Sequence, residues 1–241
     1  MLISNQLIGF GNTTRLNDAV LFDGATWLTK STDFSGVTDG KQWTFSIWFY
    51  RAAGTGGNIF GLNAEPFFQV GSSGSASIGL YTPGSTSNPL IITIPSSTFA
   101  EDTWYNILVS IDLTNTGSRH VYINDASATV TWTAYNNLVC EFSDPIGIGA
   151  SDVGGDPFNG SMYDFWMNFN QYIDFSIEAN RRKFITSGGS PVPLGVDGQI
   201  PNGSAPDVFL SGIAPTWHVN KGTGGGFTEN GALTIAPSKP E

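Results

Sequence analysis

The chain alternates apolar and polar side chains over short runs, and Gly, Pro, Asn and Asp separate these runs. A period of two places successive side chains on opposite faces of a β-strand. Regularly spaced runs of this kind are typical of a sandwich or barrel. In residues 104–113, one face would carry Tyr105, Ile107, Val109, Ile111 and Leu113. The alternation therefore predicts an all-β fold.

The run WTFSIWFY, residues 43–50, carries large aromatic side chains on both faces. As a strand it would direct four apolar side chains to one side, namely Trp43, Phe45, Ile47 and Phe49. Trp48 and Tyr50 would lie on the other side, although a half-buried strand needs only one apolar face. Two explanations are open. The N-terminal arm, a helix or the C-terminal tail covers the second face, which we expect, or that face is a platform on which a glycan stacks.

One segment breaks the period of two. Residues 174–189, DFSIEANRRKFITSGG, predict a short helix with Ser176 as its N-cap and the basic residues 181–183 as its solvated end. No long linker separates two cores. We therefore expect an N-terminal arm over residues 1–17, one domain over residues 18–186, and a Gly/Pro-rich C-terminal extension over residues 187–241. The extension would pack on the domain or on a neighbouring protein.

Charge and cysteine content exclude several classes of protein. The chain has 20 acidic against 10 basic residues, a formal net charge of −10, which argues against nucleic acid and against a polybasic membrane anchor. No apolar run is long enough to span a bilayer. The N-terminus lacks the pattern of a secretory signal. The single cysteine, Cys140, cannot form an intramolecular disulfide or a cysteine metal cluster.

Several motifs occur in one order along the chain. They are FSIWFYR (45–51), WYNILVSID (104–112), VYIND (121–125), PIGIGA (145–150), FNGSMYDFWMNF (158–169) and FSIEANRRKF (175–184). This order resembles the concanavalin A-like jelly rolls, in particular their laminin-G-like branch. The resemblance covers about residues 18–186. It implies a two-sheet antiparallel jelly-roll sandwich with one short helix.

The segment from residue 190 to residue 234 is similar to tails that follow laminin-G-like domains in proteins of tailed bacteriophages. This resemblance implies a non-enzymatic structural protein of the virion, either a capsid decoration protein or a tail-associated component. Its partners would be other virion proteins or copies of itself. The alternative is a lectin-like carbohydrate-binding module, on a virion or as an extracellular or soluble protein, which recognises a host surface glycan and uses calcium.

Catalytic patterns are absent from the sequence. Laminarinases share this general fold and carry paired carboxylates as E-x-D-x-x-E or E-x-D-x-E on one strand, as two-carboxylate glycoside hydrolysis requires. No glutamate here has such companions: Glu65, Glu101, Glu141, Glu178, Glu229 and Glu241. The two histidines, His120 and His218, lie in no nucleophile motif. We expect no enzymatic activity.

Two binding sites are candidates. Exposed aromatic rings stack on sugars, and Asn side chains bind sugar hydroxyls, which suggests Trp132, Tyr135 and Asn136, and Tyr81 with Asn88. Hard cations bind carboxylate, amide and carbonyl oxygens. A calcium site could therefore use three residues of the loop SDVGGDPFNG: Asp152, Asp156 and Asn159. The same residues also form ordinary turns, so a loop without metal remains open.

Overall fold

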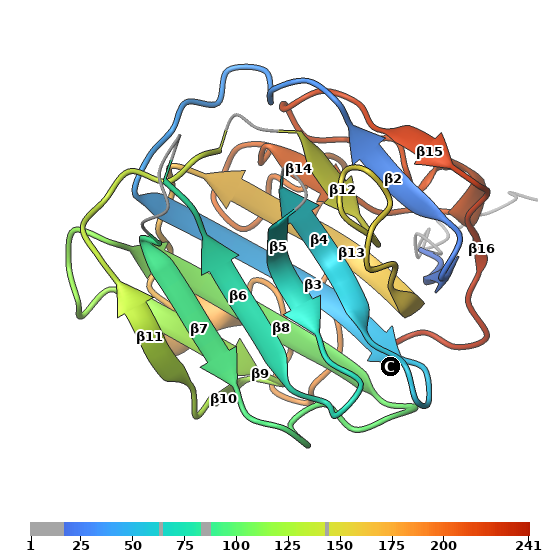
Figure 1. Cartoon of the computed structure of the whole chain (residues 1–241), viewed down its shortest axis with the longest axis horizontal. Helices are drawn as coiled ribbons and strands as arrows, with labels where there is room; N and C mark the ends of the chain where they lie inside the picture. Colours follow the sequence, from blue (N-terminus) through green and yellow to red (C-terminus); the bar gives the residue numbers. More distant parts are fainter. Residues whose placement is uncertain (1–16, 63–64, 83–87, 143–144) are drawn as a thin grey trace, which may run out of the picture.

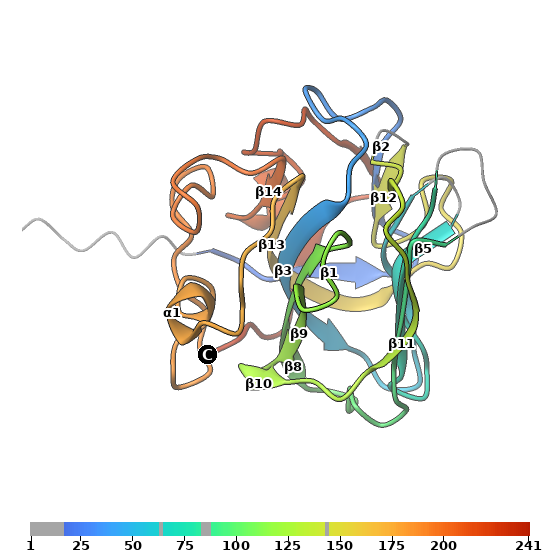
Figure 2. The same ribbon diagram turned by 90° about the vertical axis from the view of Figure 1, so that its left-hand side faces the viewer.

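The computed structural model describes residues 17–62, 65–82, 88–142 and 145–241. Two antiparallel sheets of eight strands each face one another (Figures 1 and 2). This confirms the predicted all-β, two-sheet sandwich. The predicted N-terminal arm falls almost entirely on residues 1–16, outside the described residues.

The first sheet, sheet A, has the order β10-β9-β8-β3-β13-β1-β16, and β14 pairs with β13. Its strands are β1 (Val20–Asp23), β3 (Gln42–Arg51), β8 (Trp104–Asp112), β9 (Arg119–Ile123), β10 (Ala126–Ser127), β13 (Asn159–Phe169), β14 (Val208–Leu210) and β16 (Thr234–Ile235). Long β3 lies at the centre of sheet A, between β8 and β13.

The second sheet, sheet B, has the order β11-β7-β6-β5-β4-β12-β2-β15. Its strands are β2 (Trp27–Lys30), β4 (Gly57–Leu62), β5 (Glu65–Val70), β6 (Ala76–Leu80), β7 (Leu90–Ile94), β11 (Thr131–Tyr135), β12 (Ile146–Ile148) and β15 (Thr228–Asn230). The segment after residue 187 thus contributes strands to both sheets, because β14 and β16 join sheet A and β15 joins sheet B.

The main core lies between the sheets and is rich in aromatic rings. Phe60 of sheet B lies 5.3 Å, centroid to centroid, from both Phe45 and Phe165 of sheet A. The four apolar side chains predicted on one face of β3 are all fully buried: Trp43, Phe45, Ile47 and Phe49. Truncating a Phe in such a core to Ala costs about 3–5 kcal/mol, because transfer and cavity terms add.

A second apolar cluster covers the outer face of sheet A. Its buried members are Trp48, Leu108, Trp166, Ile173, Phe175, Phe184, Ile185, Leu194 and Phe209. Most of the non-strand members come from residues 173–194, which Figure 2 shows lying with α1 (Glu178–Arg181) against the outside of β3, β8 and β13. The chain itself therefore covers the face that carries Trp48, as expected from the sequence.

Hydrogen bonds attach this covering segment to the sheet. The Thr44 hydroxyl donates to the main-chain oxygen of Gln171 at 2.8 Å, and the amide of Ile173 donates to the Ser110 hydroxyl oxygen at 2.9 Å. Thr44 and Ser110 are themselves 2.7 Å apart across β3 and β8. Buried hydroxyls are costly unless they are bonded, so these contacts fix where the segment crosses the sheet.

The helix differs from its prediction at both ends. It spans Glu178–Arg181, and Ile177 occupies the N-cap position without a side-chain cap. The predicted cap, Ser176, is wrong because its hydroxyl donates to the Asp174 carboxylate at 2.5 Å. The basic end is not a freely solvated end either, since Arg181 lies 2.6 Å and Arg182 2.7 Å from the carboxylate of Asp125.

No helix among the described residues is long and apolar enough to cross a membrane.

Candidate functional site

Trp132 and Tyr135, predicted as sugar platforms, both contact the side chain of Arg119. The guanidinium of Arg119 lies 4.9 Å from the ring centre of Trp132 and 5.1 Å from that of Tyr135. The two rings meet edge to face at 5.7 Å. Both side chains are half-buried and pack on the main core. Cation–π contacts of this kind already use aromatic faces that a sugar would need.

Asn136 and Tyr81 lie at one end of sheet B. The Asn136 amide donates to the main-chain oxygen of Pro89 at 2.7 Å, and its side-chain nitrogen donates to that of Asn88 at 2.9 Å. Tyr81 follows β6, which pairs with β7 next to Pro89. The structure therefore brings Asn136, Asn88 and Tyr81 to the same end of neighbouring strands.

The proposed calcium loop is closed by hydrogen bonds between its own residues. The Ser151 amide donates to the Gly155 oxygen at 2.9 Å, and the Gly155 amide donates to the Ser151 hydroxyl oxygen at 2.8 Å. Asp156 has a left-handed φ of 47°, and its main-chain oxygen accepts from the Asn58 amide. Across the described ranges, no group of three or more His, Cys, Asp or Glu side chains is placed to hold a metal ion.

Cys140 and His120, which could in principle act in catalysis, are instead buried or bonded to other residues of the fold. Cys140 is buried, and burial raises the pKa of its thiol to about 12, so the thiol is protonated at neutral pH. His120 has its Nε2 2.6 Å from the Tyr172 hydroxyl and 3.2 Å from the Asp174 carboxylate. Burial lowers the pKa of His120, while Asp174 opposes that shift. His120 of β9 thus contacts Tyr172 and Asp174, which lie in or next to the segment that covers sheet A.

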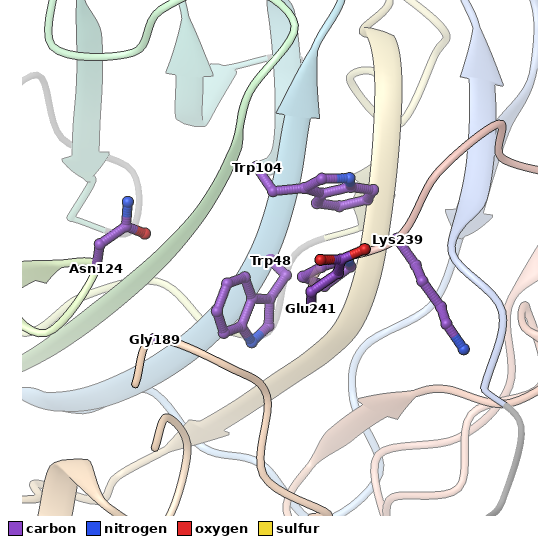
Figure 3. Close-up of a pocket in the computed structure, with 7 residues that line it drawn as sticks. Trp48, Trp104, Asn124, Gly189, Lys239 and Glu241 are labelled. Carbon is purple, nitrogen blue, oxygen red and sulfur yellow. The ribbon is translucent and has the colours of Figure 1, made fainter. Parts of the chain in front are cut away.

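An open pocket of about 440 Å³ lies on the outer side of sheet A. We call it the indole pocket; its lining residues, drawn in Figure 3, are Trp48, Trp104, Asn124, Gly189, Lys239, Pro240 and Glu241. Trp48 comes from β3 and Trp104 from the start of the adjacent strand β8. Trp104 is half-buried and lies 5.7 Å from Tyr50, centroid to centroid. Two indoles on neighbouring strands thus form one aromatic wall.

Neutral amides lie beside and beneath the indoles. Asn106 is directly opposite Trp48 in the pairing of β3 with β8, on the same strand face as Trp104. Its main-chain amide donates to the side-chain oxygen of Asn124 at 2.8 Å. The side-chain oxygen of Asn106 is buried and accepts no hydrogen bond from any described residue. Asn106 is fully buried and is not among the residues that line the pocket, whereas Asn124, which accepts the hydrogen bond from its main-chain amide, does line it.

The chain's own tail forms one wall of the indole pocket. The indole nitrogen of Trp104 donates to the Ser238 hydroxyl oxygen at 3.0 Å, and Pro240 is buried. The sequence left open a glycan platform on the strand face that carries Trp48, but it did not indicate Trp104, Asn124 or residues 239–241 as its partners. The strand period was sufficient to place Trp104, Asn106 and Leu108 on the face opposite Tyr105. It could not bring residues 238–241 to that face.

The sequence model of the concanavalin A-like lectin/glucanases superfamily matches residues 22–168. No curated protein matches the chain.

Many solved structures share the fold, and two of them illustrate the likeness. A heptameric SAP-like pentraxin from Limulus polyphemus superimposes with a TM-score of 0.50 at 16% identity, covering 91% of this chain and 96% of the pentraxin. A protein from Bacteroides ovatus, described as a "putative carbohydrate binding protein", gives a TM-score of 0.56 at 15% identity. That match covers 92% of this chain and 60% of the other. At these identities the likeness shows the fold alone.

Proposed function

The chain belongs to the concanavalin A-like lectin/glucanases superfamily, and we propose that it is a non-enzymatic carbohydrate-binding module whose site is the indole pocket. The observation that carries this proposal is that two indoles, those of Trp48 and Trp104, line one open pocket together with the amide side chain of Asn124. Ligand sites of this kind are concave and mostly apolar, with a few polar groups that orient the ligand.

The chemistry of the pocket suits a neutral sugar. The C–H face of a pyranose ring is apolar and stacks on aromatic rings, while its hydroxyls donate to and accept from amides. The side-chain amide of Asn124 lines the pocket, and the Trp104 indole offers a donor that already binds a hydroxyl, that of Ser238. Hydrogen bonds between neutral groups are modest individually, so we expect affinity to depend mainly on the aromatic contact.

The number of carboxylate side chains at the indole pocket supports binding rather than hydrolysis. The described residues that line the indole pocket include one carboxylate side chain, that of Glu241. Two carboxyl groups flanking the sugar bond are needed in most glycoside hydrolases. The superfamily membership is consistent with a binding role as well as with hydrolysis, and the residues favour the former.

A glycan array followed by titration tests the site. The full chain should bind a defined glycan, and Trp104→Ala should weaken that binding at least about tenfold, as expected when an aromatic contact worth 1.4 kcal/mol or more is lost. Trp132→Ala is the matched control and should leave the affinity unchanged, since Trp132 packs against Arg119. Loss of binding in Trp132→Ala with retention in Trp104→Ala would place the site at Trp132 and Tyr135 instead.

We further propose that the module is carried on a tailed bacteriophage particle, as a capsid decoration or tail-associated component. The support is the sequence similarity of residues 190–234 to tails of phage proteins, together with a charged content of only 12%. Native source material should be separated on a density gradient. The chain is expected to co-band with nuclease-resistant, DNA-containing particles, and its retention in the soluble fraction would contradict a virion role.

A further inference from the structure

We infer that residues 238–241, which form one wall of the indole pocket, are an intrachain competitor that covers the indole of Trp104 and must move before a ligand can bind fully. This inference rests on the proposed function of the pocket, and it concerns how access to that pocket is regulated. The tail presents a hydroxyl and an apolar ring to the two indoles, and these are the two chemical features by which a sugar would be recognised.

The hydroxyl contact is made by Ser238. Trp104 is the residue whose indole faces the pocket, and its single N–H donor is satisfied by the Ser238 oxygen at 3.0 Å. An indole has no second donor, so a ligand hydroxyl can use this group only after Ser238 has left. The tail therefore blocks the one donor that the aromatic wall offers.

The apolar contact involves Pro240. This residue is buried, although Pro237, Ser238, Lys239 and Glu241 on either side of it are exposed. Trp48 is only 4% exposed while Pro240 and Glu241 line the same pocket. Figure 3 shows Glu241 between the two indoles and the Lys239 side chain directed away from them. Trp48 also belongs to the buried cluster formed with residues of the segment 173–194, so the tail adds to a cover that is already present.

The attachment of the tail is weak enough for exchange. The last main-chain hydrogen bond that holds it runs from the Ala236 amide to the Ala19 oxygen, at the end of the β1–β16 pairing. Beyond that point, the hydrogen bond found between described residues is Trp104 to Ser238. One neutral hydrogen bond and one buried ring can be given up when a ligand replaces both. The apparent affinity of the pocket is then reduced by the fraction of molecules in which the tail is bound.

The test uses the full-length chain with Ser238→Ala and Pro240→Gly combined, and Lys239→Ala as the matched control. For the glycan found on the array, the double variant should bind roughly tenfold more tightly than wild type, as expected if the tail is bound in about 90% of molecules. Lys239→Ala should bind like wild type. Equal affinity of the double variant and wild type would overturn the inference while leaving the proposed function intact.

A second measurement tests the cover by the tail separately from the carbohydrate function, and it applies even when no glycan binds. Acrylamide quenching of tryptophan fluorescence should increase in the double variant, because Trp104 loses its contact with Ser238 and becomes more accessible. A synthetic peptide of residues 237–241 added to that variant should restore the wild-type quenching. If the peptide restores it and no glycan binds either protein, the tail occupies the pocket but the proposed carbohydrate function fails. If quenching is the same in both proteins, the inference is overturned.

Discussion

The hydroxyl of Tyr135 lies 2.6 Å from the main-chain oxygen of Asp112, across the turn that joins β8 to β9. It also lies within 3.2 Å of the main-chain oxygens of Asn115 and Ser118. Burial raises the pKa of this phenol, so the hydroxyl remains a donor throughout the physiological range. Tyr135 therefore holds the 112–118 turn closed, and its ring supports Arg119.

Tyr135→Phe should lower the free energy of unfolding by about 1 kcal/mol, because the half-buried main-chain oxygens of Asp112 and Ser118 lose a hydroxyl donor. For a chain of this size the melting temperature should fall by a few degrees. Tyr50→Phe is the control, since its hydroxyl bonds to the exposed Asp102 and its loss should cost less. Equal melting temperatures of Tyr135→Phe and wild type would show that the turn does not depend on this hydroxyl.

The ion pair between Asp125 and the helix predicts a pH-dependent stability. The hydrogen bond from Arg182, together with Arg181, holds the pKa of Asp125 below its usual value. A carboxylate whose folded pKa is depressed stabilises the protein above its unfolded pKa near 4, and that stability is lost as the pH falls through the folded value.

Asp125→Asn preserves the left-handed backbone at this position, which has a φ of 66°, and removes the charge. Because the carboxylate is partly exposed, we expect the variant to be less stable at pH 7 by about 0.5–1 kcal/mol. The difference should shrink as the pH falls from about 4 through the depressed folded pKa of Asp125. Chemical denaturation at pH 7 and at several pH values between about 4 and about 2 measures this. A difference that stays as large at low pH as at pH 7 would attribute the effect to something other than the charge.

The loop from Asp152 to Asn159 is either an ordinary turn or a calcium site, and a substitution of Asp156 distinguishes the two. Its internal hydrogen bonds and the left-handed φ of Asp156 favour a turn. On that basis Asp156→Gly should keep or slightly raise the melting temperature, because glycine adopts positive φ without strain. Millimolar calcium and chelator should leave the wild-type melting temperature unchanged. A rise with calcium that Asp156→Gly abolishes would instead establish the metal site, since a ligand of the native state stabilises it.

Local patterns predicted the fold because burial in a sandwich repeats every second residue. The inward set of β3 followed directly from its alternation, and the excess of aromatics on its outer face correctly indicated cover by the chain. The prediction of Ser176 as the helix cap was wrong because the Asp174 carboxylate, two residues earlier, accepts from its hydroxyl. Local preference does not decide whether a serine hydroxyl bonds to the helix backbone or to a neighbouring carboxylate.

The indole pocket was harder to predict, because its residues come from positions 48, 104, 124, 189 and 239–241. Only strand register and the path of the tail bring them together, and neither is encoded in a short segment. Trp132 and Tyr135 were selected from the sequence as aromatic residues after a hairpin. Their packing against Arg119 depends on the pairing of β11 with β7, which places them back over the 112–118 turn.

The position of β3 between β8 and β13 has a consequence for synthesis on the ribosome. Trp43, Phe45 and Phe49 leave the exit tunnel early, but β13, one of the two neighbours of β3, ends only at Phe169. At typical translation rates, residues 52–169 take roughly 6–24 s to make. During that interval a ten-residue aromatic strand has an unpaired edge. The native pairing with β8 covers the other edge, so the edge that awaits β13 is the one exposed to aggregation unless a chaperone binds it.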